Sequence, residues 1–309
     1  MTTTHHSDPS PAPYVGAWAA WHLHLGTAAT SAGDRVLRET IEPAVVALGR
    51  PWFFIRYWQG GPHLRLRVAG LTAPEVATTT ARLEESLRSS GTLRDGEAPL
   101  DAAAFSAEAA RHAAAETGSD RVAGDVLAPG VHPSTYEPEL QRYGGPALMV
   151  ANEELFELSS QMVAAVLRSS PSRGQRAAAA LRATVAAATT LGDAADHAVF
   201  YGIGQGAWRR WAEQFGYPAE VVGAASSVTP EALGGVPVHP RDHGPFAPWH
   251  EAVAGLVDDV LTTAPERHPG EIVSSQVHMT HNRLGLGILD ELRTYALLAR
   301  AFPSSVATG

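Results

Sequence analysis

Residues 51–68 read PWFFIRYWQGGPHLRLRV and predict a β-hairpin. Trp52–Tyr57 is rich in aromatic and β-branched residues, and residues 63–68 alternate between polar and apolar side chains. The Gly60-Gly61-Pro62 sequence between them is typical of a turn. The stretch therefore predicts two antiparallel strands around which the other elements can pack.

The second strand of this hairpin has one apolar and one cationic face. Successive side chains of a strand point to opposite sides of a sheet, so its leucines enter the core. His63, Arg65 and Arg67 then line the other side, where Arg56 of the first strand can bring a third guanidinium. Guanidinium groups bind carboxylates through two parallel hydrogen bonds, so this row predicts an anion site. A solvated strand face is the alternative interpretation.

Composition excludes several classes of chemistry. The 309 residues include 23 basic and 32 acidic side chains, and the net charge of −9 disfavours a surface that wraps nucleic acid. All of the basic residues are arginines, so a Schiff-base lysine, and with it the usual pyridoxal-phosphate chemistry, is excluded. A phosphate-binding P-loop is excluded for the same reason. The absence of cysteine excludes disulfides, thiol nucleophiles and cysteine zinc sites.

The two ends of the chain are expected to be tails. Residues 1–13 are polar and proline-rich, unlike a secretory signal, and we expect them to be disordered. A second tail is expected at 304–309, with a single domain over 14–303. No apolar run approaches the roughly 20 residues that a bilayer requires, so we expect a soluble cytoplasmic protein.

A first strand is predicted at residues 16–26, GAWAAWHLHLG. On this strand His22 and His24 share a face, and two histidines at this spacing can hold a metal ion. No third ligand of a suitable type is evident nearby in the sequence. We therefore predict no metal site.

Helical periodicity and alanine-rich composition dominate the remainder. Helices are expected at 34–48, 72–89 and 102–116, and then at 147–168, 175–191, 193–200, 207–215, 249–263 and within 270–302. Gly202, Gly204 and Gly206 lack the preceding strand that a dinucleotide-binding fingerprint needs. The predicted fold class is α+β, with an antiparallel sheet built on hairpin 51–69, helices packed against it, and a largely helical second half.

Two further segments carry clustered polar residues. Residues 134–146, STYEPELQRYGGP, form a constrained turn that brings Glu139 near Arg142. In the last helical segment His278 and Asn282 are four residues apart and share a helix face, with His281 and Arg283 to one side. A structural glycine turn and an ordinary helical histidine are the alternative interpretations.

Taken together, three segments resemble the carboxy-terminal elimination domain of lantibiotic dehydratases, which also occurs as a separate chain in thiopeptide gene clusters. The segments are WFFIRY with GPHLRLR, YEPELQRYGG and HMTHNRLG, in this order and over most of the chain. That family has an α+β fold with an antiparallel sheet. Ser159-Ser160 departs from its pattern, in which an acidic residue precedes the serine.

The resemblance implies a function in the biosynthesis of ribosomally made peptides. A partner enzyme uses glutamyl-tRNA to glutamylate serine or threonine, and the elimination domain expels glutamate to leave dehydroalanine or dehydrobutyrine. Carried across by motif, the catalytic residues are Arg65, Arg67, Arg142 and His278. The residues expected to bind substrate are Arg56, His63, Glu139, Asn282 and Arg283. No metal or organic cofactor is implied.

The implied chemistry suits these residue types. Removing the α-proton builds negative charge on a carbonyl oxygen while glutamate leaves as a carboxylate, and preorganised cations stabilise both. A histidine can transfer a proton near neutral pH, and we expect general acid or base catalysis by His278. Expected partners are the glutamylated precursor peptide and a separate glutamylating dehydratase, without direct binding to nucleic acid or membrane. A homodimer is one possible assembly.

Two other functions remain open. Thiopeptide pyridine synthases use the same fold to join two dehydroalanines in a formal [4+2] cycloaddition, with release of the leader peptide. A non-catalytic partner that binds an extended peptide along the hairpin edge is the other. The presence of Arg65, Arg67, Arg142 and His278 together favours elimination.

Overall fold

The computed structural model describes residues 17–117, 125–229 and 243–302. The tails expected at 1–13 and 304–309 lie outside these residues, and the single domain over 14–303 stays a prediction. Among the described helices, none is long and apolar enough to cross a lipid bilayer.

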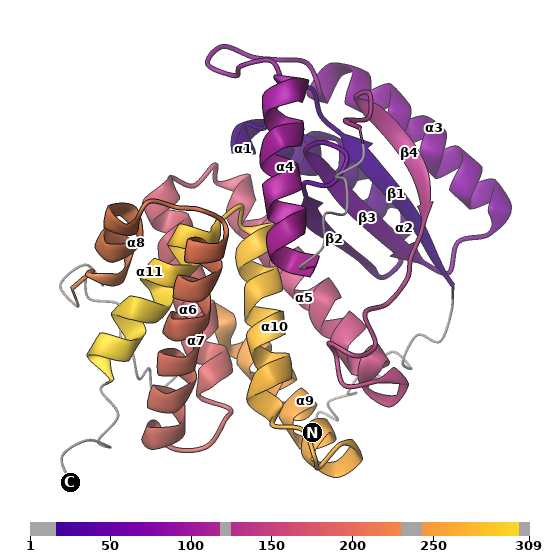
Figure 1. Ribbon diagram of the computed structural model, residues 1–309. Coiled ribbons are helices and arrows are strands. Elements are labelled where there is room, and N and C mark those ends of the chain that lie inside the picture. The colour runs from indigo at the N-terminus through magenta and orange to yellow at the C-terminus, as the bar shows by residue number, and fades with distance from the viewer. Residues whose placement is uncertain (1–16, 118–124, 230–242, 303–309) are drawn as a thin grey trace, which may run out of the picture.

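The fold is α+β, as predicted, with the sheet and first helices at one end and the later helices at the other (Figure 1). The strands are β1 (Trp18–His24), β2 (Trp52–Tyr57), β3 (His63–Ala69) and β4 (Gly130–Thr135). In the first part of the chain, the helices are α1 (Thr30–Val36) and α2 (Glu42–Leu48), joined by a π-helical turn, then α3 (Ala73–Ser90) and α4 (Ala102–Thr117). The later helices are α5 (Met149–Arg168), α6 (Arg173–Ala188), α7 (Ala194–Gln214), α8 (Ala219–Ser226), α9 (Ala247–Thr263), α10 (Pro269–Arg283) and α11 (Ile288–Ala301).

The sheet is antiparallel with strand order β2-β3-β1-β4. The hairpin prediction is confirmed, and its turn uses positive φ angles at Gly60 and Gly61, +78° and +107°, that favour glycine. Strand β4 was not predicted because its sequence, GVHPST, lacks an apolar alternation. Its Pro133 lies opposite Trp21 on an edge strand, where a missing backbone donor is tolerated.

One face of the sheet forms a hydrophobic core with the first three helices. Trp21, Leu23, Phe54, Leu64 and Leu66 are buried on this face. They pack with side chains of α1, α2 and α3. Because the residues between them in each strand point the other way, the second face of the sheet is free to carry polar groups.

The later helices form a second hydrophobic core. Trp249 of α9, Tyr201 of α7 and Tyr295 of α11 are buried within it. Helix α5 connects this core to the sheet, since Phe156 contacts Phe53 of β2 with ring centroids 5.3 Å apart. The polar face of the sheet therefore lies next to helices from the second half of the chain.

The two helices predicted at 193–200 and 207–215 are one helix, α7, and the expected interruption at the glycines is wrong. The glycines are explained by packing. A Cβ atom added to Gly204 would lie 2.2 Å from the ring of Tyr295, so glycine lets α7 approach α11 closely. At Gly202, no atom of the described residues outside its own stretch of helix lies within 4 Å of such a Cβ.

These two positions give a matched stability test. We expect Gly204→Ala to destabilise the protein by roughly 1–3 kcal/mol, because Tyr295 must move from a packed site. Gly202→Ala should stabilise it by up to about 1 kcal/mol, because alanine restricts the unfolded chain and favours the helix. Urea unfolding of both variants measures the difference. Equal stability of the two variants would contradict the packing explanation.

The last helical segment is two helices, separated at residues 284–287. Gly285 adopts φ +76°, and an added Cβ would lie 2.7 Å from Thr30 and 3.4 Å from Arg56. The break turns the chain so that α11 follows α10 at an angle visible in Figure 1. It also brings residues of α11 against the polar face of α10.

Candidate active site

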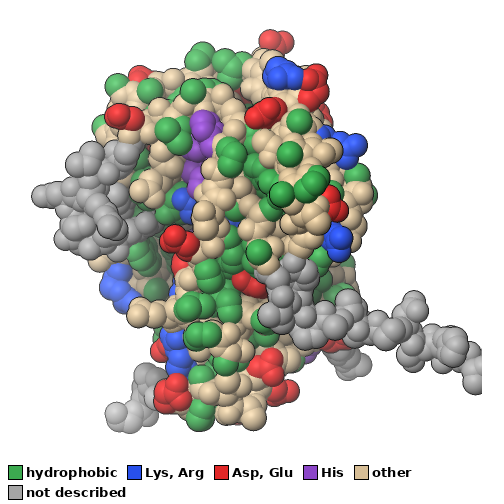
Figure 2. Space-filling model, turned by 90° about the vertical axis from the view of Figure 1, so that its right-hand side faces the viewer, with side chains coloured by type: hydrophobic (Ala, Val, Ile, Leu, Met, Phe, Trp, Pro, Cys, Tyr) green, Lys and Arg blue, Asp and Glu red, His purple; other side chains and the backbone are tan. Residues whose placement is uncertain are grey.

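The polar residues of β3 lie on one face of the sheet, beside histidines of β1. In the strand register His63 is opposite His24, and Arg65 is opposite His22. Figure 2 shows histidine side chains recessed in one face of the molecule, with a basic side chain next to them. The predicted alternation of polar and apolar side chains along β3 is therefore confirmed. Whether the polar side chains can bind an anion depends on the contacts of each arginine.

Arg65 is held between an aromatic ring and a histidine. Its guanidinium carbon lies 3.5 Å from the centroid of Tyr57, and its Nε donates to His63 Nε2 over 3.2 Å. The His63 Nδ1–H donates to the Gly61 carbonyl over 2.8 Å. Burial lowers the pKa of His63 to about 2, so the ring is a neutral acceptor that orients Arg65.

Arg67 and Arg283 are buried cations whose N–H groups are only partly paired by the residues that the structure describes. Arg67 is 6% exposed and Arg283 is fully buried. Within the described residues, two nitrogens of each guanidinium have no hydrogen-bond partner. Arg67 lies beside the rings of Phe53 and Tyr136, at 5.7 and 5.6 Å, and Arg283 lies 5.5 Å from the ring of Phe156.

The electrostatic cost of these two groups is visible in their pKa values. Burial and, to a smaller extent, the nearby charge of Arg65 lower the pKa of Arg67 to about 10. Burial lowers the pKa of Arg283 to about 9, with Arg67 again opposing the charged form. Buried guanidinium groups normally pair with a carboxylate. An anion that enters between them would supply the missing acceptors.

Arg283 is fixed by polar contacts that the sequence did not reveal. Its Nε donates to the Phe54 carbonyl over 2.8 Å and to Ser160 Oγ over 3.0 Å. Ser160 Oγ also accepts from the Phe54 N–H and donates to the Phe156 carbonyl. The sequence around Ser160 gives no sign of this contact, because a serine that faces solvent on a helix would look the same in the sequence.

The expectation that Arg56 joins the cationic row is wrong. Arg56 lies opposite Leu64 in the register, so its side chain is on the other face of the sheet from Arg65. Its Nη2 donates to Asp34 over 2.5 Å, and Asp34 also pairs with Arg176. Arg56 therefore stabilises the fold on the far side of the sheet.

Asn282 also has a structural contact in place of the expected role. Its side-chain amide accepts from the Arg56 N–H over 2.8 Å and donates to the Arg56 carbonyl over 2.9 Å. Helix α10 is thereby attached to the outer edge of β2. The side chain of Asn282 is occupied by the backbone and is not part of the candidate site.

The loop before α5 brings an arginine and a glutamate to α10. Arg142 Nη1 donates to Glu139 over 3.1 Å, and Arg142 Nε donates to Ser275 Oγ over 3.3 Å. Gly144 and Gly145 adopt φ +85° and +96°, which explains the double glycine after this loop. The predicted proximity of Glu139 and Arg142 is confirmed.

Charge interactions connect Arg142 to the remaining groups. Burial acts to lower the pKa of Arg142, but Tyr143, Glu139 and Glu291 together raise it. Glu139 in turn favours the charged forms of Arg65 and Arg67. The Glu139 carboxylate therefore stabilises the positive charge both of Arg142 in the loop and of the two arginines of β3.

His278 forms a pair with a buried carboxylate of the next helix. Its Nδ1–H donates to Glu291 Oε1 over 2.9 Å, and its ring lies 5.0 Å from that of Trp208. The side chain of Glu291 is 2% exposed, whereas that of His278 is 30% exposed. This bond leaves the lone pair on His278 Nε2, so the ring can accept a proton.

Glu291 was missed by sequence reasoning. It lies on a different helix from His278, and nothing in DELR distinguishes it from a surface acid. Its second oxygen lies 3.6 Å from the buried His281, whose pKa burial lowers despite this carboxylate. A partly exposed histidine that is held by a buried glutamate is typical of an oriented general base or acid.

The structure thus gathers most of the predicted site residues from three segments: β3, the loop before α5, and α10. Charge interactions link Arg65, Arg67, Glu139, Arg142 and Arg283, and Glu291 connects Arg142 to His278. His63 supports Arg65 from within β3. Arg56 and Asn282 are not brought into this group.

A family model described as the C-terminal region of lantibiotic biosynthesis dehydratases matches residues 18–302. Curated proteins give no match. Among solved structures, the tRNA-dependent lantibiotic dehydratase MibB from Microbispora sp. 107891 is similar, with TM-score 0.57 and 22% identity over 96% of this chain. The chain spans 28% of the length of MibB.

Two further solved structures are similar along nearly their whole length. The pyridine synthase TbtD from thiomuracin biosynthesis has TM-score 0.64 and 17% identity, covering 94% of this chain and 100% of TbtD. TsrL has TM-score 0.60 and 16% identity, covering 93% of this chain and 95% of TsrL. At these identities the three likenesses concern the fold.

Proposed function

Because the chain belongs to the family of lantibiotic biosynthesis dehydratase C-terminal domains, we propose that it eliminates glutamate from glutamylated serine or threonine side chains of a precursor peptide. The product is dehydroalanine or dehydrobutyrine. Glutamylation itself belongs, in this proposal, to a separate glutamyl-tRNA-dependent dehydratase in the same cytoplasm.

The observation that carries the proposal is the pair of buried guanidinium groups at Arg67 and Arg283. Four of their nitrogens have no partner among the described residues. Such groups are costly unless an anion completes them. A glutamyl ester brings a free carboxylate to the site and creates a second one when it leaves, so it matches two or more arginines.

The remaining groups fit the bond changes of the reaction. His278 Nε2 accepts the α-proton, and the electrons of that C–H bond form the new C=C bond. The Cβ–O bond breaks and glutamate departs with its electron pair as a carboxylate. Arg142, held next to α10 by Ser275, stabilises the negative charge that develops on the carbonyl oxygen. Arg65 and Arg67 assist the departing carboxylate.

Synthetic peptides with different esters test this proposal. Incubation with an O-glutamyl-serine peptide that carries the leader should release glutamate and lower the peptide mass by one glutamic acid. An O-glutaminyl-serine peptide, in which the side chain is neutral, should react at least about tenfold more slowly because it loses a charge-assisted contact. An absence of mass loss under conditions where the protein is folded would refute elimination.

Pyridine synthesis is the second candidate, favoured by the full-length structural likeness to TbtD. A peptide that already contains two dehydroalanines distinguishes the two functions. Cyclisation and leader release with that peptide, together with no turnover of the O-glutamyl peptide, would establish the alternative. No turnover of either peptide would favour a non-catalytic, peptide-binding function.

A further inference from the structure

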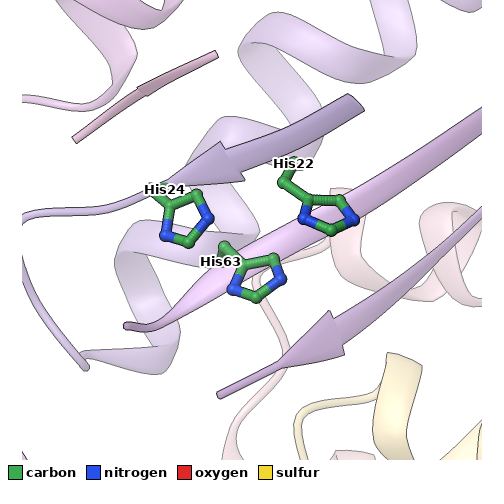
Figure 3. A group of neighbouring side chains, drawn as sticks. All are labelled: His22, His24 and His63. Atoms are coloured by element: carbon green, nitrogen blue, oxygen red, sulfur yellow. The ribbon is translucent and has the colours of Figure 1, made fainter. Parts of the chain in front are cut away.

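Three histidines outside the proposed proton-transfer pair gather on the polar face of the sheet. His22 and His24 project from β1, and His63 projects from β3 (Figure 3). The ring centroids of His24 and His63 are 4.2 Å apart, and those of His22 and His63 are 4.9 Å apart. The sequence predicted no third ligand near His22 and His24, and this expectation is wrong because the register places His63 directly opposite His24.

His24 is a buried polar group without a hydrogen-bond partner among the described residues. Its exposed fraction is 1%, and within the described residues neither ring nitrogen has a hydrogen-bond partner. The Gly60 backbone, which acts to raise the pKa of His24, lies outside hydrogen-bond geometry. Buried imidazoles usually bond through both nitrogens, so this ring calls for a ligand.

The three rings have the spacing and the charge state that a metal ion requires. One nitrogen from each ring lies within 4.8 Å of the other two. A tetrahedral ion needs nitrogens about 3.3 Å apart, given metal–nitrogen bonds of about 2.0 Å. Rotation of the rings can close that difference. Burial lowers the pKa of His22 and of His24 to about 4, so these imidazoles are neutral ligands at neutral pH.

An opening at the edge of the sheet reaches this cluster. A depression of about 490 Å³ lies where the end of α3 meets β4, and its lining includes His24, His132 and Glu84. The ring of His132 lies 5.0 Å from that of His24, while its Nε2 bonds to the Ala128 carbonyl. The depression therefore borders both His24 and a fourth imidazole, that of His132.

The neighbouring arginines limit the affinity and select the remaining ligand. Arg65 and Arg67 oppose the charged form of His22, and they would repel a dication in the same way. An ion bound through His63 Nε2 also replaces the hydrogen bond from Arg65. These costs predict micromolar rather than nanomolar binding. The positive charges of the two arginines also favour an anion, such as a carboxylate, as the fourth ligand of the ion.

From this geometry we propose that His22, His24 and His63 form a binding site for a divalent d-block metal ion of the zinc type. Imidazole ligands suit zinc, copper and nickel, whereas magnesium and calcium prefer oxygen. The observations behind this site do not depend on the proposed elimination, but an ion bound there would compete with Arg65 for His63 Nε2.

Zinc titration of the full chain tests the site. The protein should carry His5→Ala and His6→Ala, which remove the adjacent histidine pair of the amino terminus. Isothermal titration calorimetry with Zn²⁺ should show one ion per chain. His24→Gln should raise the dissociation constant at least about tenfold by removing one of three ligands. Zn²⁺ should also raise the unfolding temperature of the parent more than that of this variant.

A second stacked pair of histidines provides the matched control. The rings of His243 and His250 are 4.1 Å apart. The double variant His243→Gln/His250→Gln should bind Zn²⁺ as the parent does. If His24→Gln does not fold, His22→Gln decides, since the ring of His22 is partly exposed. Less than one ion per chain in the parent, or unchanged affinity in both His22→Gln and His24→Gln, would overturn the proposal.

Discussion

His278→Ala is expected to lower the rate of glutamate elimination by about a thousandfold, within the range found for loss of a general acid or base. The physical reason is that no other described imidazole combines partial exposure with a hydrogen bond to a buried carboxylate in this site. Because its side chain is 30% exposed, the substitution should leave the fold intact. Single-turnover assays with the O-glutamyl-serine peptide, with circular dichroism of the variant, measure both effects.

Glu291→Gln separates positioning from proton transfer. The amide retains the shape of the carboxylate, but its NH2 group can donate to His278 Nδ1 and favour the tautomer whose Nε2 carries the proton, so kcat should fall roughly a hundredfold or more. KM should change little, because Glu291 is buried behind the histidine. His250→Ala, which alters an imidazole of α9, is the control and should retain the parent rate. Turnover of His278→Ala within a few-fold of the parent would remove this residue from the mechanism.

Arg67→Met is expected to change activity and stability in opposite directions. Elimination should slow by about a hundredfold or more, because the departing carboxylate loses a buried guanidinium partner. The free energy of unfolding should rise by about 1–3 kcal/mol, because an apolar side chain of similar length replaces a buried cation with unpaired N–H groups. Kinetics with the O-glutamyl peptide and urea unfolding without ligand measure the two effects.

The exposed Arg209 gives the matched control for this substitution. It forms an ion pair with Glu213 one turn away on α7, and such surface pairs contribute little. Arg209→Met should therefore leave both activity and stability nearly unchanged. A loss of stability in Arg67→Met comparable to that of a broken buried ion pair would mean that the guanidinium has partners in the free protein, and the anion-site interpretation would fail.

The hairpin and its two faces could be predicted because a strand has a period of two residues. That period separates Leu64 from Arg65 without any knowledge of the neighbouring strands. The same rule shows why Arg56 was misplaced. Its face depends on which residue of β3 lies opposite, and the register is a property of the pairing rather than of either strand alone.

The contacts between distant segments were harder to predict for a related reason. The sequence identified Arg142 and His278 as candidates, but their common neighbour Glu291 became evident only through the packing of α11 against α10. Gly204 was likewise misread as a helix break, because a propensity cannot show that Tyr295 occupies the space beside it. Chemistry-bearing residue types can be read along the chain, whereas their pairing depends on tertiary structure.

The contacts along β2 have a consequence for how this sheet can meet other polypeptides. Arg283, Ser160 and Asn282 together engage the outward backbone groups of Phe54 and Arg56. An incoming strand would find those donors and acceptors already taken by side chains, so edge-to-edge association is suppressed along this border. Under the proposed function, the precursor peptide is therefore not expected to extend the hairpin along β2.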